Sequence, residues 1–417
     1  MRTIILNILL VWPLVAFAPP SPGSAQAGTQ RQVVALEIYE GPEVSSRIGY
    51  GNCQWLHPLD EPNETLAAQP DYRSDKPYYY AARYGDAQDN VHSIVLDESG
   101  GTGTGYDTVY ADVNNDNRID PNTERFAFTL GTTSHAEPVR IKLTVTAGGR
   151  PFPYSFEFTA FPYQDENNPV KKVHANCRNS SIFVGQAVFE GTQYKVAIAD
   201  LNSNGLFNDT EQGMFRGDRF FVDFNDDDRF RDSDDAGTES FSYGRYTKIA
   251  GKWYTIQARP DGQSIAIAPA QPELGTVKAP TGIGVVELHS AAQSQRLEFS
   301  GGSAEAVAGR YKLASVGLSM SDENDQGWTA SGNFREEDLT LDVKPGGILP
   351  LPEMLPLTVS IEPAGKAPFE EVSLGAKIVS PAGGTFRTPR STGRPAGGFE
   401  VQDAEGNVVA QATFEYG

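Results

Sequence analysis

The sequence has little of several residue types on which common enzyme sites depend. Only 5 histidines and 2 cysteines occur among its 417 residues. The chain contains no His-Glu-x-x-His, Gly-x-Ser-x-Gly, Gly-x-x-x-x-Gly-Lys or Cys-x-x-Cys motif, so no familiar zinc-protease, hydrolase, phosphate-binding or dithiol site is present. Basic residues are also in the minority, with 34 Lys and Arg against 54 Asp and Glu and a formal charge of −20. A nucleic-acid partner is therefore not expected, because it requires a basic surface.

Apolar runs of membrane length are absent as well. The longest apolar stretch, Ile4–Ala18, follows the positive charge of Arg2 and is shorter than a membrane helix requires. A small-residue sequence, Ala25-Gln26-Ala27, comes after it. This order predicts a secretory signal peptide over residues 1–27 and a mature chain that starts at Gly28. We expect a secreted, periplasmic or cell-surface protein that does not span the membrane.

The two cysteines, Cys53 and Cys177, are far apart in the sequence. In an oxidising compartment an even number of cysteines permits one disulfide, and a long closed loop would constrain the unfolded chain strongly. Two free thiols are the alternative, because sequence alone does not place two Cα atoms within bonding distance. Both possibilities stay open at this point.

Helical periodicity is nearly absent, and short alternating stretches separated by Gly-rich turns follow one another along the chain. Examples are Val33–Tyr39, Pro77–Tyr84 and Tyr194–Ala199. The pattern predicts an all-β protein built from tandem β-sandwich domains. After the signal peptide, we expect units at residues 28–165, 166–273, 274–346 and 347–417, the last resembling a small immunoglobulin-like sandwich.

What the chain does have is three acidic stretches, which begin at Asp112, Asp200 and Asp223. In each, oxygen-bearing side chains occupy positions 1, 3, 5 and mostly 9, and an apolar residue occupies position 8. This is the oxygen spacing of an EF-hand-type calcium loop, because Ca²⁺ takes six to eight oxygen ligands. The predicted Ca²⁺ ligands are Asp112, Asn114, Asp116 and Asp120; Asp200, Asn202, Asn204, Asn208 and Glu211; and Asp223, Asn225, Asp227 and Asp234.

The three stretches differ in how closely they follow the pattern. The Asp200 stretch has Gly205 at position 6 and Glu211 at position 12, whereas the Asp112 stretch has Thr123 at position 12 and Glu124 one residue later. Each stretch follows an expected strand, and the 23-residue offset from Asp200 to Asp223 predicts that these two loops lie together. Metal-free turns are the alternative, because Asp and Asn side chains also form turns with their own backbone.

These loops resemble the calcium loops of dockerins and thrombospondin type 3 repeats over about a dozen residues each. Strands rather than dockerin helices are expected beside them, so cohesin binding is not implied. Their spacing does not fit the even blade period of integrin-like β-propellers. The stretches Leu96–Asp120 and Asp200–Asp234, with the ending Phe414–Gly417, resemble secreted bacterial multi-β-domain proteins, a likeness that implies no activity. The turn Ala308–Tyr311 resembles that of transthyretin-like and carboxypeptidase-regulatory-like modules.

The sequence therefore favours a calcium-binding structural, adhesive or surface-associated β protein over an enzyme. A calcium-dependent carbohydrate-binding module is the first alternative, because exposed aromatic side chains on sheets can stack on sugars. Its candidate aromatic residues are Tyr78, Tyr79, Tyr80, Trp253 and Trp328. A hydrolase that uses a carboxylate pair is the second alternative, since a glycosidase needs only two such groups. Calcium ions, a polysaccharide or a cell-surface protein are the expected partners.

The leader generates a first prediction. Because a charged start, an apolar run and Ala25-Gln26-Ala27 follow in order, we expect export and cleavage after Ala27. Mass spectrometry of the exported protein should give an N-terminus at or near Gly28. A mature protein that retains Met1 would contradict the prediction.

Overall fold

A computed structural model describes residues 31–40, 44–48, 53–132, 137–163, 172–210, 217–230, 239–242, 244–321, 327–334, 339–364, 373–387, 398–402 and 407–413. The predicted signal peptide lies outside these ranges. Within them the protein is all-β, as the sequence predicted, apart from the five-residue helix α1 (Val44–Ile48). No helix in these ranges is both long enough and apolar enough to cross a membrane.

Four antiparallel sheets form the first unit, and three of them combine strands that are distant in sequence, whereas β4 to β7 are consecutive. The first sheet has the order β1 (Gln32–Ala35), β17 (Ser264–Pro269), β16 (Lys252–Ala258), β15 (Thr247–Ile249). The second has the order β14 (Ser240–Ser242), β13 (Arg219–Asp223), β12 (Thr192–Ala199), β11 (Ser181–Phe189), β2 (Glu37–Glu40). The third sheet has the order β3 (Gln54–Leu56), β10 (Lys172–Asn179), β9 (Arg150–Tyr163), β8 (Val139–Ala147). The fourth has the order β4 (Tyr78–Arg83), β5 (Val91–Asp97), β6 (Thr108–Ala111), β7 (Arg125–Ala127).

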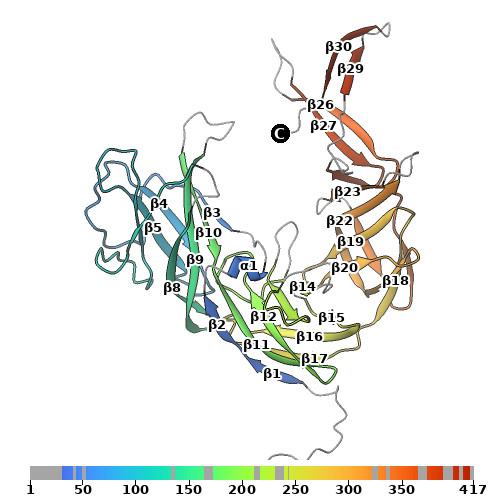
Figure 1. Ribbon diagram of the computed structural model, residues 1–417, viewed down its shortest axis with the longest axis horizontal. Helices are drawn as coiled ribbons and strands as arrows, with labels where there is room; N and C mark the ends of the chain where they lie inside the picture. The colour runs from blue at the N-terminus through green and yellow to red at the C-terminus, as the bar shows by residue number, and fades with distance from the viewer. Residues whose placement is uncertain are drawn as a thin grey trace, which may run out of the picture.

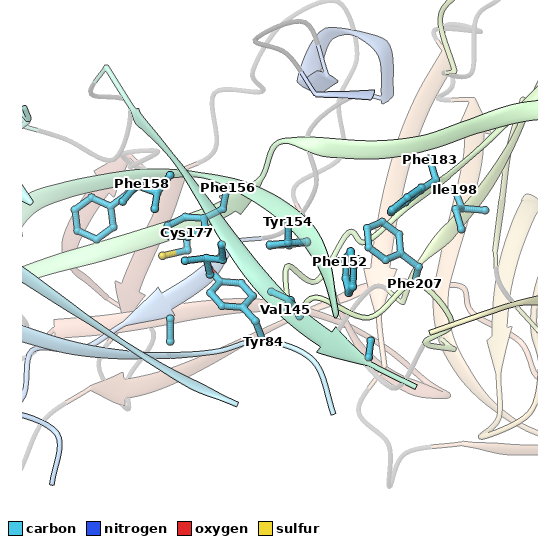
Figure 2. Packing of buried hydrophobic residues seen from close by; sticks show 14 of the residues in the cluster. Tyr84, Val145, Phe152, Tyr154, Phe156, Phe158, Cys177, Phe183, Ile198 and Phe207 are labelled. Atoms are coloured by element: carbon cyan, nitrogen blue, oxygen red, sulfur yellow. The ribbon is translucent and has the colours of Figure 1, made fainter. Parts of the chain in front are cut away.

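All four sheets contribute to one hydrophobic core, which runs from Val34 to Ile267. Alternate residues of each strand enter it, as the two-residue period of a strand requires. Figure 2 shows aromatic side chains of β9 in this core, with Phe152 and Tyr154 near Phe207 of a connecting loop. The Phe183 and Phe207 rings meet edge to face with centroids 4.9 Å apart.

This shared core corrects the predicted boundary between residues 165 and 166. Strand β9 pairs with β10 across that boundary, with Tyr163 opposite Lys172. In addition, β1, β2 and β3 each pair with a strand from beyond residue 165. The alternating patterns located the strands, but they carried no information on which distant strands would pair. Residues 32–269 are therefore one unit with one shared main core, beside which two smaller clusters lie.

A second core occupies residues 274–386, which we call the second unit (orange strands in Figure 1). Its smaller sheet has the order β21 (Ser303–Val307), β18 (Leu274–Lys278), β25 (Ile348–Pro350). Its larger sheet contains β20 (Ser294–Glu298), β19 (Ile283–His289), β22 (Gly309–Ser321), β23 (Gly327–Asn333), β28 (Gly383–Phe386), β27 (Ser373–Ser380) and β26 (Thr358–Ala364), with β24 (Thr340–Val343) beside β22.

The predicted boundary between residues 346 and 347 also falls inside a core. Leu351, Met354 and Phe386 are buried in the same cluster as residues of β18 to β24. Beyond it, β29 (Gly398–Gln402) and β30 (Val408–Thr413) form a separate two-stranded hairpin. The predicted four units are thus two larger cores and a hairpin in the described part of the chain.

The structure has Cys53 and Cys177 as free thiols, which is the second of the two alternatives. Cys177 lies opposite Gln54 in the β3–β10 pairing, so Cys53 is one residue from its cross-strand neighbour. Burial is the main reason why the pKa of Cys177 is raised to about 12. A thiol with so high a pKa is a poor nucleophile at neutral pH.

The shared core predicts how fragments of the first unit behave. A fragment of residues 28–165 lacks the partners of β1, β2 and β3 and much of the core, so we expect no cooperative thermal transition. A fragment of residues 28–273 should unfold cooperatively when followed by circular dichroism. Cooperative melting of residues 28–165 alone, near the temperature of the longer fragment, would contradict the single core.

Candidate metal centre in three acidic loops

Each acidic stretch connects two neighbouring antiparallel strands of the first unit. We call them the first acidic loop (Asp112–Glu124, between β6 and β7), the second acidic loop (Asp200–Asp218, between β12 and β13) and the third acidic loop (Asp223–Glu239, between β13 and β14). The first aspartate of each lies at the end of the outgoing strand. Its position is therefore fixed by the sheet and not by the loop alone.

The side chain at position 1 organises each loop in the same way. The aspartates Asp112, Asp200 and Asp223 are almost completely buried. One carboxylate oxygen accepts the N–H of position 5, with donor–acceptor distances of 3.1 Å for Asp116, 3.3 Å for Asn204 and 3.2 Å for Asp227. The other oxygen accepts the N–H of position 6, at 3.0 Å from Asn117, 2.7 Å from Gly205 and 3.1 Å from Asp228.

The side chains at positions 3 and 5 also accept hydrogen bonds from backbone N–H groups of their own loop. The Oδ1 atoms of Asn114, Asn202 and Asn225 accept the N–H of position 5 at 3.0, 3.2 and 3.0 Å. The Oδ1 atoms of Asp116, Asn204 and Asp227 accept the N–H of position 7 at 2.9, 2.8 and 2.8 Å. Positions 4 and 6 of every loop have positive φ, which Asn, Asp and Gly adopt at the lowest cost. The sequence spacing thus encodes one repeated loop conformation.

Position 8, which is apolar in every loop, anchors each loop in a hydrophobic cluster. Ile119, Phe207 and Phe230 are at most 4% exposed. Their N–H groups donate to backbone carbonyls of other segments, namely Ala68 at 3.1 Å, Pro260 at 3.0 Å and Arg47 at 2.6 Å. Loss of a buried phenylalanine side chain costs about 3–5 kcal/mol, so these residues tie loop geometry to the stability of the unit.

A second acid closes each loop; the sequence pointed to it only in the first loop, where Glu124 follows position 12 by one residue. Glu124, Asp218 and Glu239 are each the last residue before the returning strand and are at most 2% exposed. Glu124 Oε1 accepts the N–H of Val113, and Glu239 Oε1 accepts the N–H of Phe224, both at 2.9 Å. Burial raises the pKa of Asp218, and the backbone N–H of Leu201 acts against that shift. In all three loops, the closing acid therefore faces the backbone of position 2.

The signal for the closing acids was present, but it was not the position-12 rule. They occupy positions 13, 19 and 17 of their loops, because the three loops differ in length. The usable signal was the hairpin topology, since the residue before a returning strand lies beside the residue after the outgoing one. The predicted position-12 ligands Glu211 and Asp234 lie outside the described residues. Both predicted position-9 ligands, Asp120 and Asn208, are exposed, and Asp120 Oδ1 accepts the Asn122 N–H.

The paired acids disfavour ionisation of one another. Burial, followed by the charge of Glu124, raises the pKa of Asp112 to about 6. Burial raises the pKa of Glu124, and burial together with the charge of Asp223 raises that of Glu239. The raised pKa values mean that the surrounding protein groups only partly compensate the negative charge of two neighbouring carboxylates. The described residues contain no group of three or more His, Cys, Asp or Glu side chains that could hold a metal ion.

The second acidic loop is the most deeply buried of the three. Asp200 is fully buried, accepts a hydrogen bond of 2.8 Å from the Tyr154 hydroxyl, and has its pKa raised by burial to about 7. Asp218 is 1% exposed, and its Oδ2 accepts the Asp209 N–H at 2.6 Å. Its Oδ1 is buried without a hydrogen-bond partner among the described residues. Burial and the charge of Asp200 raise the pKa of Asp218 well above its usual range.

The third acidic loop is fastened to the rest of the unit by ion pairs at position 6. Asp228 contacts Arg47 of α1 and Lys195 of β12, each at 2.6 Å. The hydrogen bond from Lys195 and the charge of Arg47 outweigh the opposing effect of burial and leave the pKa of Asp228 below its usual value. Asp228 therefore supports the loop from outside and leaves Asp223 and Glu239 to face each other.

The predicted juxtaposition of the second and third loops is wrong. In the β12–β13 pairing, Ala199 lies opposite Arg219 and Lys195 lies opposite Asp223. Asp200 and Asp223 therefore lie at opposite ends of β13, because a strand that turns back separates the loops at its two ends. The first and second loops each contact the connection between β4 and β5 instead: Asn117 Nδ2 donates to Asp89 Oδ2 at 3.0 Å, and Gly85 N donates to the Asn204 carbonyl at 2.7 Å.

Most of the aromatic candidates for sugar stacking are packed against the protein. Tyr80 is 1% exposed, and Tyr78 and Tyr79 lie against Tyr106 and Tyr72 with ring centroids 5.0 and 6.0 Å apart. Trp253 is half-buried beneath the Lys248 ammonium, and Trp328 is half-buried on β23. The aromatic strand over residues 78–80 is therefore packing, the alternative that its alternation pattern also allowed.

Comparison with known proteins gives no assignment for these loops or for the fold. No protein-family description matches the chain, and neither a curated protein nor a solved structure is similar to it. The likeness to dockerin and thrombospondin type 3 loops therefore remains a prediction that depends on the loop residues alone.

Proposed function

We propose that this chain is an exported, calcium-stabilised β protein with a structural, adhesive or surface-associated role. The observation that carries the proposal is the pairing of a buried first aspartate with a buried closing acid in all three loops. Three separate hairpins reach the same arrangement with different loop lengths. A requirement shared by the three sites, rather than the needs of one turn, explains the repetition.

A cation accounts for features that a metal-free turn does not. Turns formed by Asp and Asn explain the hydrogen bonds at positions 1, 3 and 5, but they do not require a second buried carboxylate. Two buried like charges are costly unless a proton or a cation compensates them. The second loop has in addition the Asp218 Oδ1 atom without a partner. A divalent ion between Asp200 and Asp218 would satisfy that atom and neutralise the pair.

The donor set favours calcium among divalent ions. Every candidate ligand is an oxygen from a carboxylate, an amide or the backbone, which suits hard cations and not zinc or copper. Carboxylate oxygens that already accept one N–H retain a lone pair for a cation. Magnesium demands stricter octahedral geometry and releases water reluctantly, so it should substitute poorly. An exported protein also meets calcium at concentrations for which weak sites suffice.

The third acidic loop offers a matched pair of variants to test the proposal. Asp223→Asn removes a charge from a buried first-position side chain, whereas Asp226→Asn removes the same charge from an exposed residue whose φ of 58° Asn also tolerates. Calcium at about a hundredfold excess over Kd stabilises the folded state by about 2.7 kcal/mol per site. That corresponds to a rise in Tm of roughly 5–10 °C for a unit of this size.

We expect calcium, compared with a chelator, to raise the Tm of the wild type and of Asp226→Asn by similar amounts. Asp223→Asn should show a smaller rise, because one site is lost. Differential scanning calorimetry in calcium, magnesium and chelator measures all three proteins. An unchanged Tm in calcium, or equal losses in the two variants, would show that the loops are ordinary turns with a non-specific charge effect.

A further inference from the structure

The two units of the protein meet at the turn that connects β19 and β20. We call this segment, residues 290–293, the joint turn, and in Figure 1 strand β20 lies near β14 and β15. The Ala292 carbonyl accepts the N–H of Arg245 at 2.9 Å. The Gln293 side chain binds both backbone groups of Tyr246: its Oε1 accepts the Tyr246 N–H at 2.7 Å, and its Nε2 donates to the Tyr246 carbonyl at 2.6 Å. The joint turn therefore docks on the first unit as a neighbouring strand would.

Hydrogen bonds, rather than a shared core, hold the two units together. Each of the four hydrophobic clusters in the described ranges lies within a single unit. One ion pair crosses the joint, between Lys248 and Glu305 at 3.5 Å, but both side chains are exposed, so its contribution is small. Gln293 is 5% exposed and makes the best shielded of the bonds. An interface of this polar kind permits movement between units unless further contacts oppose it.

The second acidic loop contributes a further contact to the joint. The Thr210 hydroxyl donates to the Ala291 carbonyl at 3.3 Å. Thr210 directly follows Asp209, which is bonded to the closing acid in both directions. The Asp209 N–H donates to Asp218 Oδ2 at 2.6 Å, and the Asp218 N–H donates to the Asp209 carbonyl at 3.0 Å. The position of the Thr210 hydroxyl therefore depends on where Asp218 is held.

The protein groups around Asp218 hold it incompletely. Its Oδ1 atom is buried without a hydrogen-bond partner among the described residues, and the residue is 1% exposed. The other buried carboxylate of the loop, Asp200, adds the repulsion of a like charge. A cation between the two acids would remove that repulsion and fix Asp218. Through Asp209, the same cation would also fix Thr210.

We propose that calcium in the second acidic loop fixes the orientation of the second unit relative to the first, by ordering Thr210 against the joint turn. This inference depends on the calcium binding proposed above and gives that binding a conformational consequence. Calcium favours the docked arrangement to the extent that it binds this arrangement more tightly than the undocked one. The coupling is reciprocal, so docking of the joint turn also raises the calcium affinity of the loop.

Amide hydrogen exchange of Arg245 and Tyr246 reports on the joint, because the acceptors of both N–H groups lie in the second unit. The test uses the full mature chain in calcium and in chelator. Mass spectrometry resolves exchange to single residues, and native mass spectrometry counts the bound calcium ions. We expect calcium to slow exchange at both positions about three- to tenfold, which is the equilibrium factor of one net hydrogen bond.

Thr210 offers a matched pair of variants. Thr210→Val removes the hydroxyl but keeps a similar shape and every acid of the loop, whereas Thr210→Ser keeps the hydroxyl. Both variants should bind as many calcium ions as the wild type. Calcium should slow the exchange of Arg245 and Tyr246 in Thr210→Ser but not in Thr210→Val. A general stabilisation of the first unit by calcium is common to both variants and therefore does not produce this difference.

Two results separate this inference from the proposed function. Calcium uptake without slower exchange at the joint, or with equal slowing in the two variants, would overturn the inference and leave the proposed calcium binding in place. Absence of calcium uptake by the wild type would overturn both.

Discussion

The structure of the first unit depends on how it accommodates pairs of carboxylates buried at the ends of its hairpins. Asp112, Asp200 and Asp223 each accept two backbone N–H groups, and each lies near a second buried acid. Hydrogen bonds from the loop compensate part of the charge. The raised pKa values of Asp112 and Asp200, about 6 and about 7, show that the compensation is incomplete without a further positive charge.

Position 8 couples each loop to buried residues: Phe207 lies in the shared core, and Ile119 and Phe230 lie in two smaller clusters. Phe207 of the second loop packs on Phe183 and Phe152 (Figure 2). The hydroxyl of Tyr154, in the same core, donates a hydrogen bond to Asp200. The chemistry of the loop and the packing of the unit are thus joined within a few residues. Any ion that orders the second loop would stabilise the unit as a whole, because it binds the folded state and not the unfolded one.

Sequence patterns that depend on neighbouring residues proved reliable. The all-β class and the strands that lead into the loops follow from local spacing. Pairings between distant strands did not, so the predicted boundaries at residues 165 and 346 fall inside cores. For the same reason Glu124, Asp218 and Glu239 were not predicted as ligands, because only the return of the paired strand brings them close to the first aspartate. The sequence offset also predicted that Asp200 and Asp223 lie together, whereas β13 separates them.

The central claim is that these carboxylate pairs hold calcium, and the number of bound ions tests it most directly. Native mass spectrometry of the mature protein, after exchange into calcium and removal of free ion, counts them. The account predicts saturation at three calcium ions per chain, and at two for Asp223→Asn. A spectrum with no discrete calcium-bound species, or with the same adducts in magnesium, would contradict it.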